Sequence, residues 1–238
     1  MPREGMTEEA GNVAGKRWFR NRTEAGMLLA NRLAAYADRP DVLILALPRG
    51  GVPVAFEIAK ALRAPLDVVI VRKLGTPGQE ELAMGAIATG GMRVLNDPVV
   101  RSLGISTRQI ESVAAKEQLE LERRERLYRS DRAALDIRDR TVILVDDGIA
   151  TGTSMQVALA AVRRQGPSRL ILAVPVAPLS TCEEMKGMVD EFVCLLSPED
   201  FMAISLWYQD FSQTSDQEVC ELLAFANQMR SSEAPIKN

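Results

Sequence analysis

Two adjacent carboxylates, Asp146 and Asp147, follow a short apolar run at residues 142–145. Neighbouring carboxylates repel each other, so the pair costs stability unless a ligand or a cation makes use of it. The two hydroxyls of a vicinal diol can each donate a hydrogen bond to one carboxylate, and a nearby Mg²⁺ would relieve the repulsion. The pair therefore indicates a site for the diol of a sugar.

The residues after the acid pair form a loop of glycine, small and hydroxyl-bearing residues. Gly148 and Gly152 permit backbone conformations that are closed to other residues. The free N–H groups that open the next helix favour an anion, and the hydroxyls of Thr151, Thr153 and Ser154 add donors. The loop thus predicts a phosphate site without a cationic side chain. The simpler alternative is an acidic turn followed by a Thr/Ser helix cap.

Two other phosphate-binding motifs fit this segment less well. No Gly-Lys-Ser/Thr ending is present, which excludes a P-loop. No G-x-G-x-x-G is present, and acids stand where a dinucleotide-binding fold has glycines. The sequence therefore favours a phosphorylated sugar over a nucleoside triphosphate or a dinucleotide.

A second loop, residues 48–51, carries another candidate anion site. Gly50 and Gly51 expose backbone N–H groups in a turn that can form an anion-binding concavity. Arg49 adds a forked donor. The alternative is a strand-to-helix turn with a solvated arginine.

The elements that must position these groups alternate along the chain between buried strands and helices. Predicted strands cover residues 42–47, 67–71, 142–145, 170–176 and 192–196. Predicted helices cover residues 23–37 with Thr23 as cap, a segment starting near Pro53, and residues 107–129, 154–164 and 218–229. Residues 83–88 and 92–95 predict a hairpin joined through Gly90 and Gly91.

This alternation predicts an α/β fold: a three-layer sandwich with a mainly parallel central sheet. In such a sheet, ligands bind at the carboxyl ends of the strands. The residues after Leu47, Val71, Val145 and Val176 are therefore the ones expected to form the site. The charged segment 107–129, with an apolar residue about every seven, predicts a long, mostly exposed helix without chemistry of its own.

Composition narrows the function further. The chain has 238 residues, of which 47 % are hydrophobic and 26 % charged, which suits one domain with additions. The net charge of −3 gives no general attraction to nucleic acid or to an anionic membrane. Three cysteines without ligand spacing and no histidine argue against a disulfide scaffold, a zinc site or a histidine base. No apolar run suits a membrane helix or a secretory signal, so a cytoplasmic protein is expected.

The segment from residue 141 to 154 resembles the signature of the type I phosphoribosyltransferases, over a similarity that spans roughly residues 17–228. The chain looks most like the bacterial stand-alone phosphoribosyltransferase-domain proteins of poorly defined substrate. Residues 1–16 mix Glu, Gly and Thr without an apolar centre and are expected to form a flexible tail, and the resemblance implies a domain at 17–230. Within that domain it implies a hairpin and mobile loop at 72–96, a charged helical insertion at 107–129 and a C-terminal hood at 197–230.

The resemblance also implies the reaction and its site. The donor would be 5-phosphoribosyl-1-pyrophosphate (PRPP) with Mg²⁺, and the acceptor a nitrogenous base, with a purine as the candidate. Asp146 and Asp147 would take the ribose hydroxyls and reach the metal only through those hydroxyls or water. The implied substrate-binding residues are Asp146, Asp147, Gly148, Ala150, Thr151, Gly152, Thr153, Ser154, Gly50 and Gly51.

The implied catalytic residues are Arg49, Lys73 and Glu81. Arg49 belongs to the implied pyrophosphate loop, and Lys73 follows Arg72 where a leaving pyrophosphate needs its charge neutralised. Some purine-salvage members carry an aspartate at the position of Ala150, so an acid that faces the base has to come from elsewhere. Glu80 and Glu81 are the candidates, and Glu81 is preferred. A solvated loop charge is the alternative for both the basic pair and the glutamates.

Three questions stay open at the level of sequence. The protein is either an enzyme or a PRPP-sensing regulator without turnover, and a third reading is phosphate chemistry on another phosphorylated sugar. The aromatic segment 201–211 packs a helix onto the sheet or stacks on a base, with packing favoured. The expected partners are PRPP, a small-molecule base and a second copy in a homodimer, with neither nucleic acid nor membrane.

Overall fold

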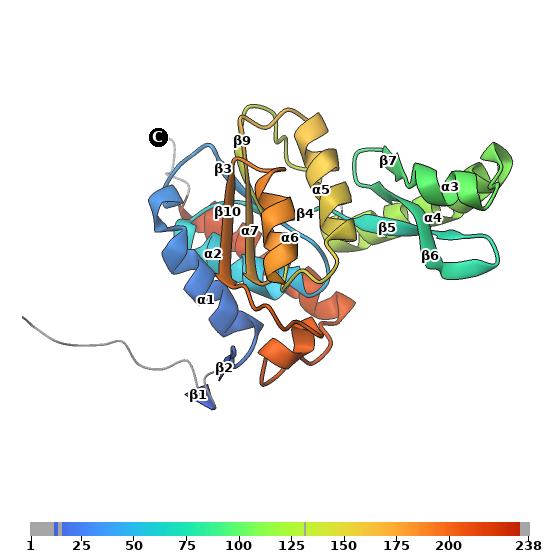
Figure 1. Cartoon of the computed structure of the whole chain (residues 1–238). Helices are drawn as coiled ribbons and strands as arrows, with labels where there is room; N and C mark the ends of the chain where they lie inside the picture. Colours follow the sequence, from blue (N-terminus) through green and yellow to red (C-terminus); the bar gives the residue numbers. More distant parts are fainter. Residues whose placement is uncertain (1–11, 14–15, 131, 234–238) are drawn as a thin grey trace, which may run out of the picture.

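A five-stranded parallel sheet forms the centre of the protein (Figure 1). The computed structural model describes residues 12–13, 16–130 and 132–233. The strand order is β10-β9-β8-β3-β4, and each neighbouring pair is parallel. The strands are β3 (Val42–Ala46), β4 (Leu66–Val68), β8 (Thr141–Val145), β9 (Arg169–Val176) and β10 (Glu191–Leu196). The strand order reverses between β3 and β8, so the crevice at their carboxyl ends is the place where a ligand is expected.

Helices cover both faces of this sheet and complete the three-layer α/β sandwich that the sequence predicts. One layer contains α1 (Arg22–Arg32), α2 (Gly51–Leu62) and α7 (Asp216–Glu233), and the other contains α5 (Thr153–Arg164) and α6 (Leu179–Lys186). Successive strand residues face opposite layers: Ile44 and Ile143 pack in the first, Leu43 and Leu144 in the second. The strands are therefore continuously apolar because both of their faces are buried.

The strand predicted at residues 67–71 is confirmed only at its start, in β4, because the chain divides there between two sheets. β4 ends at Val68, and the amide of Ile70 donates to Thr89 Oγ1 at 2.9 Å. β5 (Val71–Thr76) then pairs antiparallel with β6 (Gln79–Ala88). Residues 72–76 consequently lie on a strand of a second sheet, and not in a loop at the carboxyl end of the central sheet.

The predicted hairpin through Gly90 and Gly91 is confirmed, since β6 pairs antiparallel with β7 (Met92–Leu95). The sheet β5-β6-β7 packs against α5 through small residues, among them Ala86, Ala88 and Ala161. Together with α3 (Asp97–Ser102) it projects from one side of the central sandwich (Figure 1). We call β5-β6-β7 the side sheet.

The long charged helix is confirmed as α4 (Thr107–Arg129), which starts with a capping box formed by Ser106 and Gln109. Its buried residues are the four apolar positions spaced about every seven: Ile110, Ala114, Leu121 and Tyr128. This face contacts β5 and α7. α4 thus joins the side sheet to the central sandwich, and one face of it belongs to the core.

The remaining elements are short. They comprise β1 (Asn12–Val13), β2 (Lys16–Arg17) and the 3-10 helices η1 (Ala34–Tyr36) and η2 (Ile204–Trp207). The predicted cap Thr23 is wrong: the side chain of Asn21 accepts from Glu24 N at 3.0 Å, and α1 gives way to η1 after Arg32. The tail predicted at residues 1–16 lies largely outside the described residues. Among the helices that the structure describes, none is long and apolar enough to span a membrane.

Candidate active site

The acid pair lies directly after β8, at the carboxyl end of the sheet. The five residues of β8 are all buried, which fixes the point where the chain emerges. The backbone N–H of Asp147 donates to Asp146 Oδ1 at 2.8 Å. Asp147 is only 8 % exposed. The two carboxylates are thus held side by side by a buried strand and by their own backbone.

The glycine turn after β3 closes against this pair. Leu47 N donates to Val145 O at 2.9 Å, which extends the pairing of β3 with β8 up to the turn. A Cβ at Gly50 would lie 1.9 Å from Asp147 Oδ2, and a Cβ at Gly51 would lie 2.8 Å from Val145 O. Only glycine fits at either position, so the two predicted anion-binding loops lie in contact. The Pro48–Arg49 peptide bond, which lies between β3 and the glycine turn, is cis.

Arg22, from the first turn of α1, is the cation that faces the pair. Its Nε donates to Asp147 Oδ2 at 2.8 Å, with 12 % of the Arg22 side chain and 11 % of the Asp147 side chain exposed. Its Nη1 donates to Ser212 O at 2.7 Å, and its Cζ lies 3.9 Å from the centre of the Phe211 ring. Arg22 thus hydrogen-bonds one carboxylate of the pair, Asp147, and acts on Asp146 only through its charge.

Burial and mutual repulsion make this pair unusual electrostatically. Burial raises the pKa of Asp146 well above its ordinary value, and the charge of Asp147 raises it further. Burial also raises the pKa of Asp147, although the charge and hydrogen bond of Arg22 act in the opposite direction. The pair therefore has an unmet demand for hydrogen-bond donors or positive charge, which a diol and a cation would both satisfy.

The loop that follows leads into α5 without a capping side chain. Gly152 is the N-cap of α5, at φ +76°, and no side chain bonds the first N–H groups of the helix. Ala150, Thr151, Thr153 and Ser154 are exposed, and the carbonyl oxygen of Ala150 accepts from Thr181 Oγ1 at 2.9 Å. An uncapped helix N-terminus with adjacent hydroxyls can bind a phosphate.

The predicted catalytic residue Arg49 lies beside the glycine turn but faces α7. Its Nη1 is 4.0 Å from Asp216 Oδ1, which accepts from Tyr128 Oη at 2.5 Å. About a third of its side chain is exposed. Arg49 is thus near the predicted pyrophosphate loop and is not fixed in one tight ion pair.

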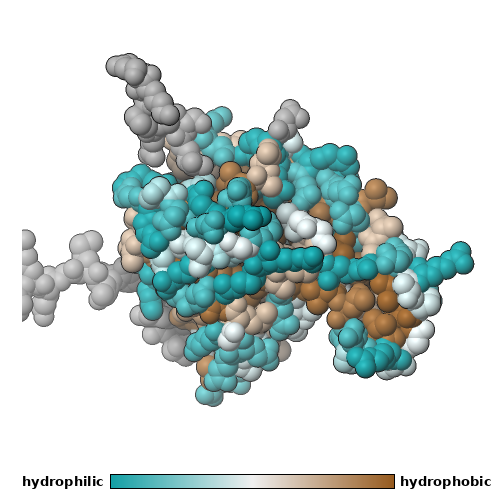
Figure 2. Space-filling view, turned by 90° about the horizontal axis from the view of Figure 1, so that it is seen from above, coloured by the Kyte–Doolittle hydropathy of each residue, from teal (hydrophilic) through white to brown (hydrophobic). Residues whose placement is uncertain are grey.

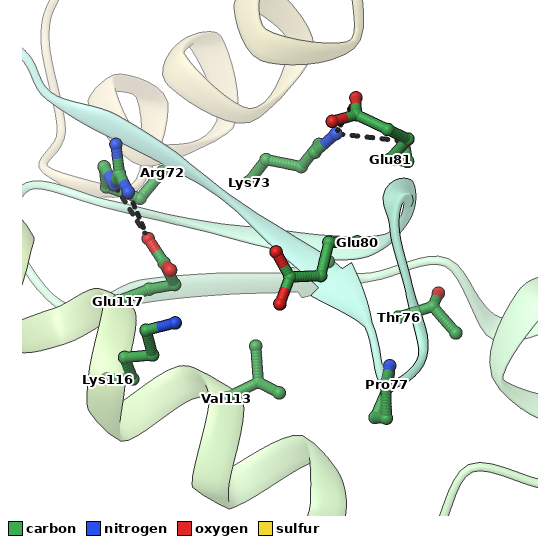
Figure 3. Close-up of a pocket in the computed structure, with 10 residues that line it drawn as sticks. Arg72, Lys73, Thr76, Pro77, Glu80, Glu81, Val113, Lys116 and Glu117 are labelled. Atoms are coloured by element: carbon green, nitrogen blue, oxygen red, sulfur yellow. Dashed lines mark hydrogen bonds and ion pairs between the residues drawn. The ribbon is translucent and has the colours of Figure 1, made fainter.

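The other two predicted catalytic residues lie on the side sheet, where they contact each other. Lys73 Nζ donates to Glu81 O at 2.9 Å and lies 3.5 Å from its Oε2. The Glu81 side chain is fully exposed. Glu80, on the opposite face of β6, points instead toward α4 (Figure 3). The structure therefore separates Lys73 and Glu81 from the acid pair by placing them on a different sheet.

Charged residues line a pocket of about 340 Å³ between the side sheet and α4 (Figure 3). The Arg72 guanidinium donates to Glu117 Oε2 at 2.5 and 2.8 Å. Lys116 and Glu80 also border the pocket. Its cations and anions are equal in number, so the pocket offers no net charge for an anion.

A second pocket, of about 380 Å³, lies between the side sheet and α5. Seen from above, hydrophobic surface gathers in a hollow between the projecting part and the main body (Figure 2). The pocket is lined by uncharged residues: Ala83, Gly85, Ala86, Val94, Leu95, Asn96, Thr153, Gln156, Val157, Ala160 and Met188. Thr153 belongs both to this lining and to the predicted phosphate loop.

The aromatic segment at 201–211 packs rather than presenting open rings. Phe201 and Trp207 stack on each other at 6.5 Å between ring centres. The Tyr208 ring lies 5.3 Å from that of Phe19 and 5.0 Å from that of Phe211. Its hydroxyl donates to the carbonyl oxygen of Asp147 at 2.7 Å. The structure therefore shows the favoured packing role. The packed segment also contacts the acid pair, through the Tyr208 hydroxyl.

Sequence reasoning missed two residues of this site. Arg22 is a cation in the first turn of a helix, where the helix dipole favours acids. An unfavourable charge at this position indicates that the residue has a partner elsewhere in the fold. Tyr208 stood within the aromatic segment, but nothing in the sequence connected its hydroxyl with Asp147. Ile204 lies so close to Gly148 that a Cβ there would be 2.7 Å from Ile204 Cγ2, which also brings η2 to the loop.

The donor set fits Mg²⁺ only as a shared site. Within the described residues, no group of three or more histidine, cysteine, aspartate or glutamate side chains could hold a metal ion. Asp146, which is partly exposed, and Asp147, which is buried, offer two carboxylates. Mg²⁺ is commonly bound by one or two carboxylates together with substrate oxygens and water. The residues present therefore suit a metal that arrives with a phosphorylated ligand.

Comparison with known proteins agrees with this geometry. The phosphoribosyl transferase domain family matches residues 21–202. Two Mycobacterium tuberculosis proteins, from strains CDC 1551 / Oshkosh and H37Rv, are named provisionally as phosphoribosyl transferases. Each is 46% identical over 205 residues, which cover 86% of this chain and 46% of the relative. The chain thus spans about half the length of these curated relatives.

One solved structure is similar to this chain over nearly the whole length of the solved protein. The crystal structure of TT1426 from Thermus thermophilus superposes with a TM-score of 0.74 at 42% identity, and covers 87% of this chain and 97% of its own. The match of the family spans the glycine turn, the acid pair and the phosphate loop. The chain belongs to the phosphoribosyl transferase domain family.

Proposed function

We propose that the protein is a Mg²⁺-dependent phosphoribosyltransferase, which moves the phosphoribosyl group of PRPP to a nitrogenous base and releases pyrophosphate. A purine is the candidate acceptor. One observation carries the proposal: a pair of adjacent carboxylates, one of them buried, is followed directly by an uncapped helix N-terminus at the switch point of the sheet. The acid pair and the phosphate loop are contiguous in the chain, so one ligand that carries both a ribose diol and a 5′-phosphate can occupy both. Membership of the family supports the same reading.

In this proposal the chain works mainly by positioning. Asp146 and Asp147 accept from the ribose hydroxyls, and the loop of Ala150, Thr151, Gly152, Thr153 and Ser154 holds the 5′-phosphate. The turn at Gly50 and Gly51 would face the pyrophosphate, although the N–H of Gly51 already donates to Leu47 O at 3.1 Å, so Gly51 contributes close backbone approach and not a donor. When bound, Mg²⁺ would supply positive charge to the phosphates of the donor, next to Asp146 and Asp147. Fixed donors around the leaving group would favour the charge that develops as pyrophosphate departs.

The proposed catalytic residues make different demands on the structure. Arg49 lies next to the glycine turn. Its guanidinium can contact pyrophosphate once it has moved away from Asp216. Lys73 and Glu81 lie on the side sheet. For them to act on the donor, that sheet has to approach the carboxyl end of β8, so their roles require a movement.

The test is to incubate the protein with PRPP, Mg²⁺ and a panel of purine and pyrimidine bases, and to measure pyrophosphate release. We expect release with at least one base. If the protein binds PRPP but releases no pyrophosphate with any base, it is the alternative, a PRPP-sensing regulator. If it binds other phosphorylated sugars in preference to PRPP, the third reading, phosphate chemistry on such a sugar, replaces both.

The cytoplasmic location, the homodimer and the absence of nucleic-acid binding stay predictions of the sequence. Binding to nucleic acid that weakens steeply with salt would favour the regulator.

A further inference from the structure

Two segments far apart in the sequence meet above the acid pair. Phe19 N donates to Trp207 O at 2.8 Å, Gln209 N to Phe19 O at 2.8 Å and Asp210 N to Arg20 O at 2.9 Å. This backbone pairing brings the start of α1 to the segment after η2. Arg22 projects from it to Asp147, and Tyr208 projects from it to the backbone of the same residue. We call Arg22, Tyr208, Phe211 and Ser212 the latch.

The latch restrains Asp147 at several atoms and leaves one face of the acid pair open. Arg22 occupies Asp147 Oδ2, Tyr208 occupies the carbonyl oxygen, and the N–H of Asp147 is taken by Asp146 Oδ1. Among the described residues, no N–H donates to Asp147 Oδ1 or Asp146 Oδ2, and the two carboxyl groups hydrogen-bond each other when one of them is protonated. These two oxygens are the acceptors that remain for a ligand.

We propose that Arg22 is a positioning residue for the sugar: by holding Asp147 Oδ2 from behind, it aims the open oxygens of the pair at the ribose diol and so sets selectivity for a sugar with both hydroxyls. This inference rests on the proposed function. It deepens that function by assigning ribose selectivity to a residue outside the phosphate loop and the acid pair.

The geometry around Arg22 suits positioning more than general charge neutralisation. The guanidinium uses two different nitrogens for Asp147 and Ser212, and its flat face rests on Phe211. This combination fixes the plane of the guanidinium and with it the carboxylate. A lysine would keep the charge but would lose the fork and the stacking. Arg22 bonds only Asp147 of the pair, so Asp146 receives no hydrogen bond from it and its demand for donors is left for the ligand.

The test compares the binding of ribose 5-phosphate and 2-deoxyribose 5-phosphate by calorimetry, in the wild type and in Arg22→Met, Arg22→Lys and Phe211→Leu. The wild type should bind ribose 5-phosphate at least about tenfold more tightly, because a site built for a hydroxyl rejects an analogue that lacks it. Arg22→Met should lower affinity for ribose 5-phosphate and hardly change that for the deoxy sugar, so that the preference collapses. Arg22→Lys and Phe211→Leu should keep part of it.

Arg20→Met is the matched control, since Arg20 lies two residues away with 71% of its side chain exposed, and its ion pair is with Glu24. It should retain the wild-type preference. If Arg22→Met prefers ribose 5-phosphate over the deoxy sugar as strongly as the wild type does, the inference is overturned while the proposed function stands. If Arg22→Met does not fold, the lysine and Phe211 variants decide, and an unchanged preference in both overturns it. If the wild type binds neither sugar, the proposed function fails and the inference falls with it.

Discussion

The acid pair after β8 and the pocket beside α4 both gather charged side chains, but they treat those charges differently. At the acid pair, two adjacent carboxylates lie beside one arginine that bonds Asp147, and desolvation raises the pKa of both. In the pocket, Arg72 pairs with Glu117, and Lys73 pairs with a fully exposed Glu81. Opposite charges, whether partly buried as in Arg72–Glu117 or exposed as in Lys73–Glu81, satisfy one another, whereas adjacent like charges removed from water require an outside partner. The difference indicates that the site for the phosphoribosyl donor belongs to the central sandwich. The side sheet can add residues to this site but does not form it.

Removing the charges of the acid pair should have the largest effect on function. Changing Asp146→Asn and Asp147→Asn together should weaken ribose 5-phosphate binding about a hundredfold or more, since hydrogen bonds to charged groups are lost. The measurement is calorimetric titration in the presence of Mg²⁺. Retained affinity in the double variant would remove the ribose assignment.

The single change Asp146→Asn separates function from stability. Because the pKa of Asp146 is raised in the folded protein, its stabilising contribution is fully present below its unfolded pKa and is lost as pH rises from there through the folded pKa. At neutral pH the asparagine variant should therefore melt no lower than the wild type. A clear drop in Tm would show that the buried charge is compensated after all.

Crowding the contact between the two loops should have the next largest effect. Gly50→Ala places a methyl group where only 1.9 Å separates it from Asp147 Oδ2. We expect a loss of about 1–3 kcal/mol in unfolding free energy and about tenfold weaker sugar binding. Gly187→Ala is the control, because its Cβ would meet nothing closer than 3.6 Å. Equal behaviour of the two variants would argue against the observed approach of the turn to the acid pair.

Changes on the side sheet should affect turnover without affecting donor affinity. Glu81→Gln should leave ribose 5-phosphate affinity within about twofold, because its ion pair is exposed. It should lower turnover about tenfold or more if the carboxylate faces the base. Glu80→Gln is the matched control, on the neighbouring position and the opposite face of the strand. Weaker sugar binding in either variant would place the side sheet within the donor site.

The smallest expected effect concerns Asp41, a partly exposed carboxylate at the other end of β3. Hydrogen bonds from Arg39 and Thr141 lower the pKa of Asp41 to about 2. A lowered folded pKa gives a contribution that is present above the ordinary value and is lost as pH falls toward about 2. The wild type should therefore lose a small stability increment between pH 4 and 2 that Asp41→Asn lacks, as measured by denaturant unfolding. Identical pH profiles would show that the contact contributes nothing.

The sequence predicts the central sheet well, because β3, β8 and β9 are buried on both faces and leave a continuous apolar signal. It also predicts the acid pair and the phosphate loop, whose residues are contiguous and follow one strand. It fails at residues 67–76, where one apolar run is shared between two sheets and only the pairing with β6 decides. It also fails at Arg22 and Tyr208, because their contacts with Asp147 join positions 125 and 61 residues apart. No local pattern reports such pairings.

The most direct test of the central claim is a crystal structure of the protein with PRPP and Mg²⁺. We predict the ribose 2′- and 3′-hydroxyls at hydrogen-bond distance, about 2.5–3.0 Å, from Asp146 and Asp147, with the 5′-phosphate on the first N–H groups of α5. A donor bound instead among Arg72, Lys116 and Glu117, with the acid pair free of sugar, would contradict the account.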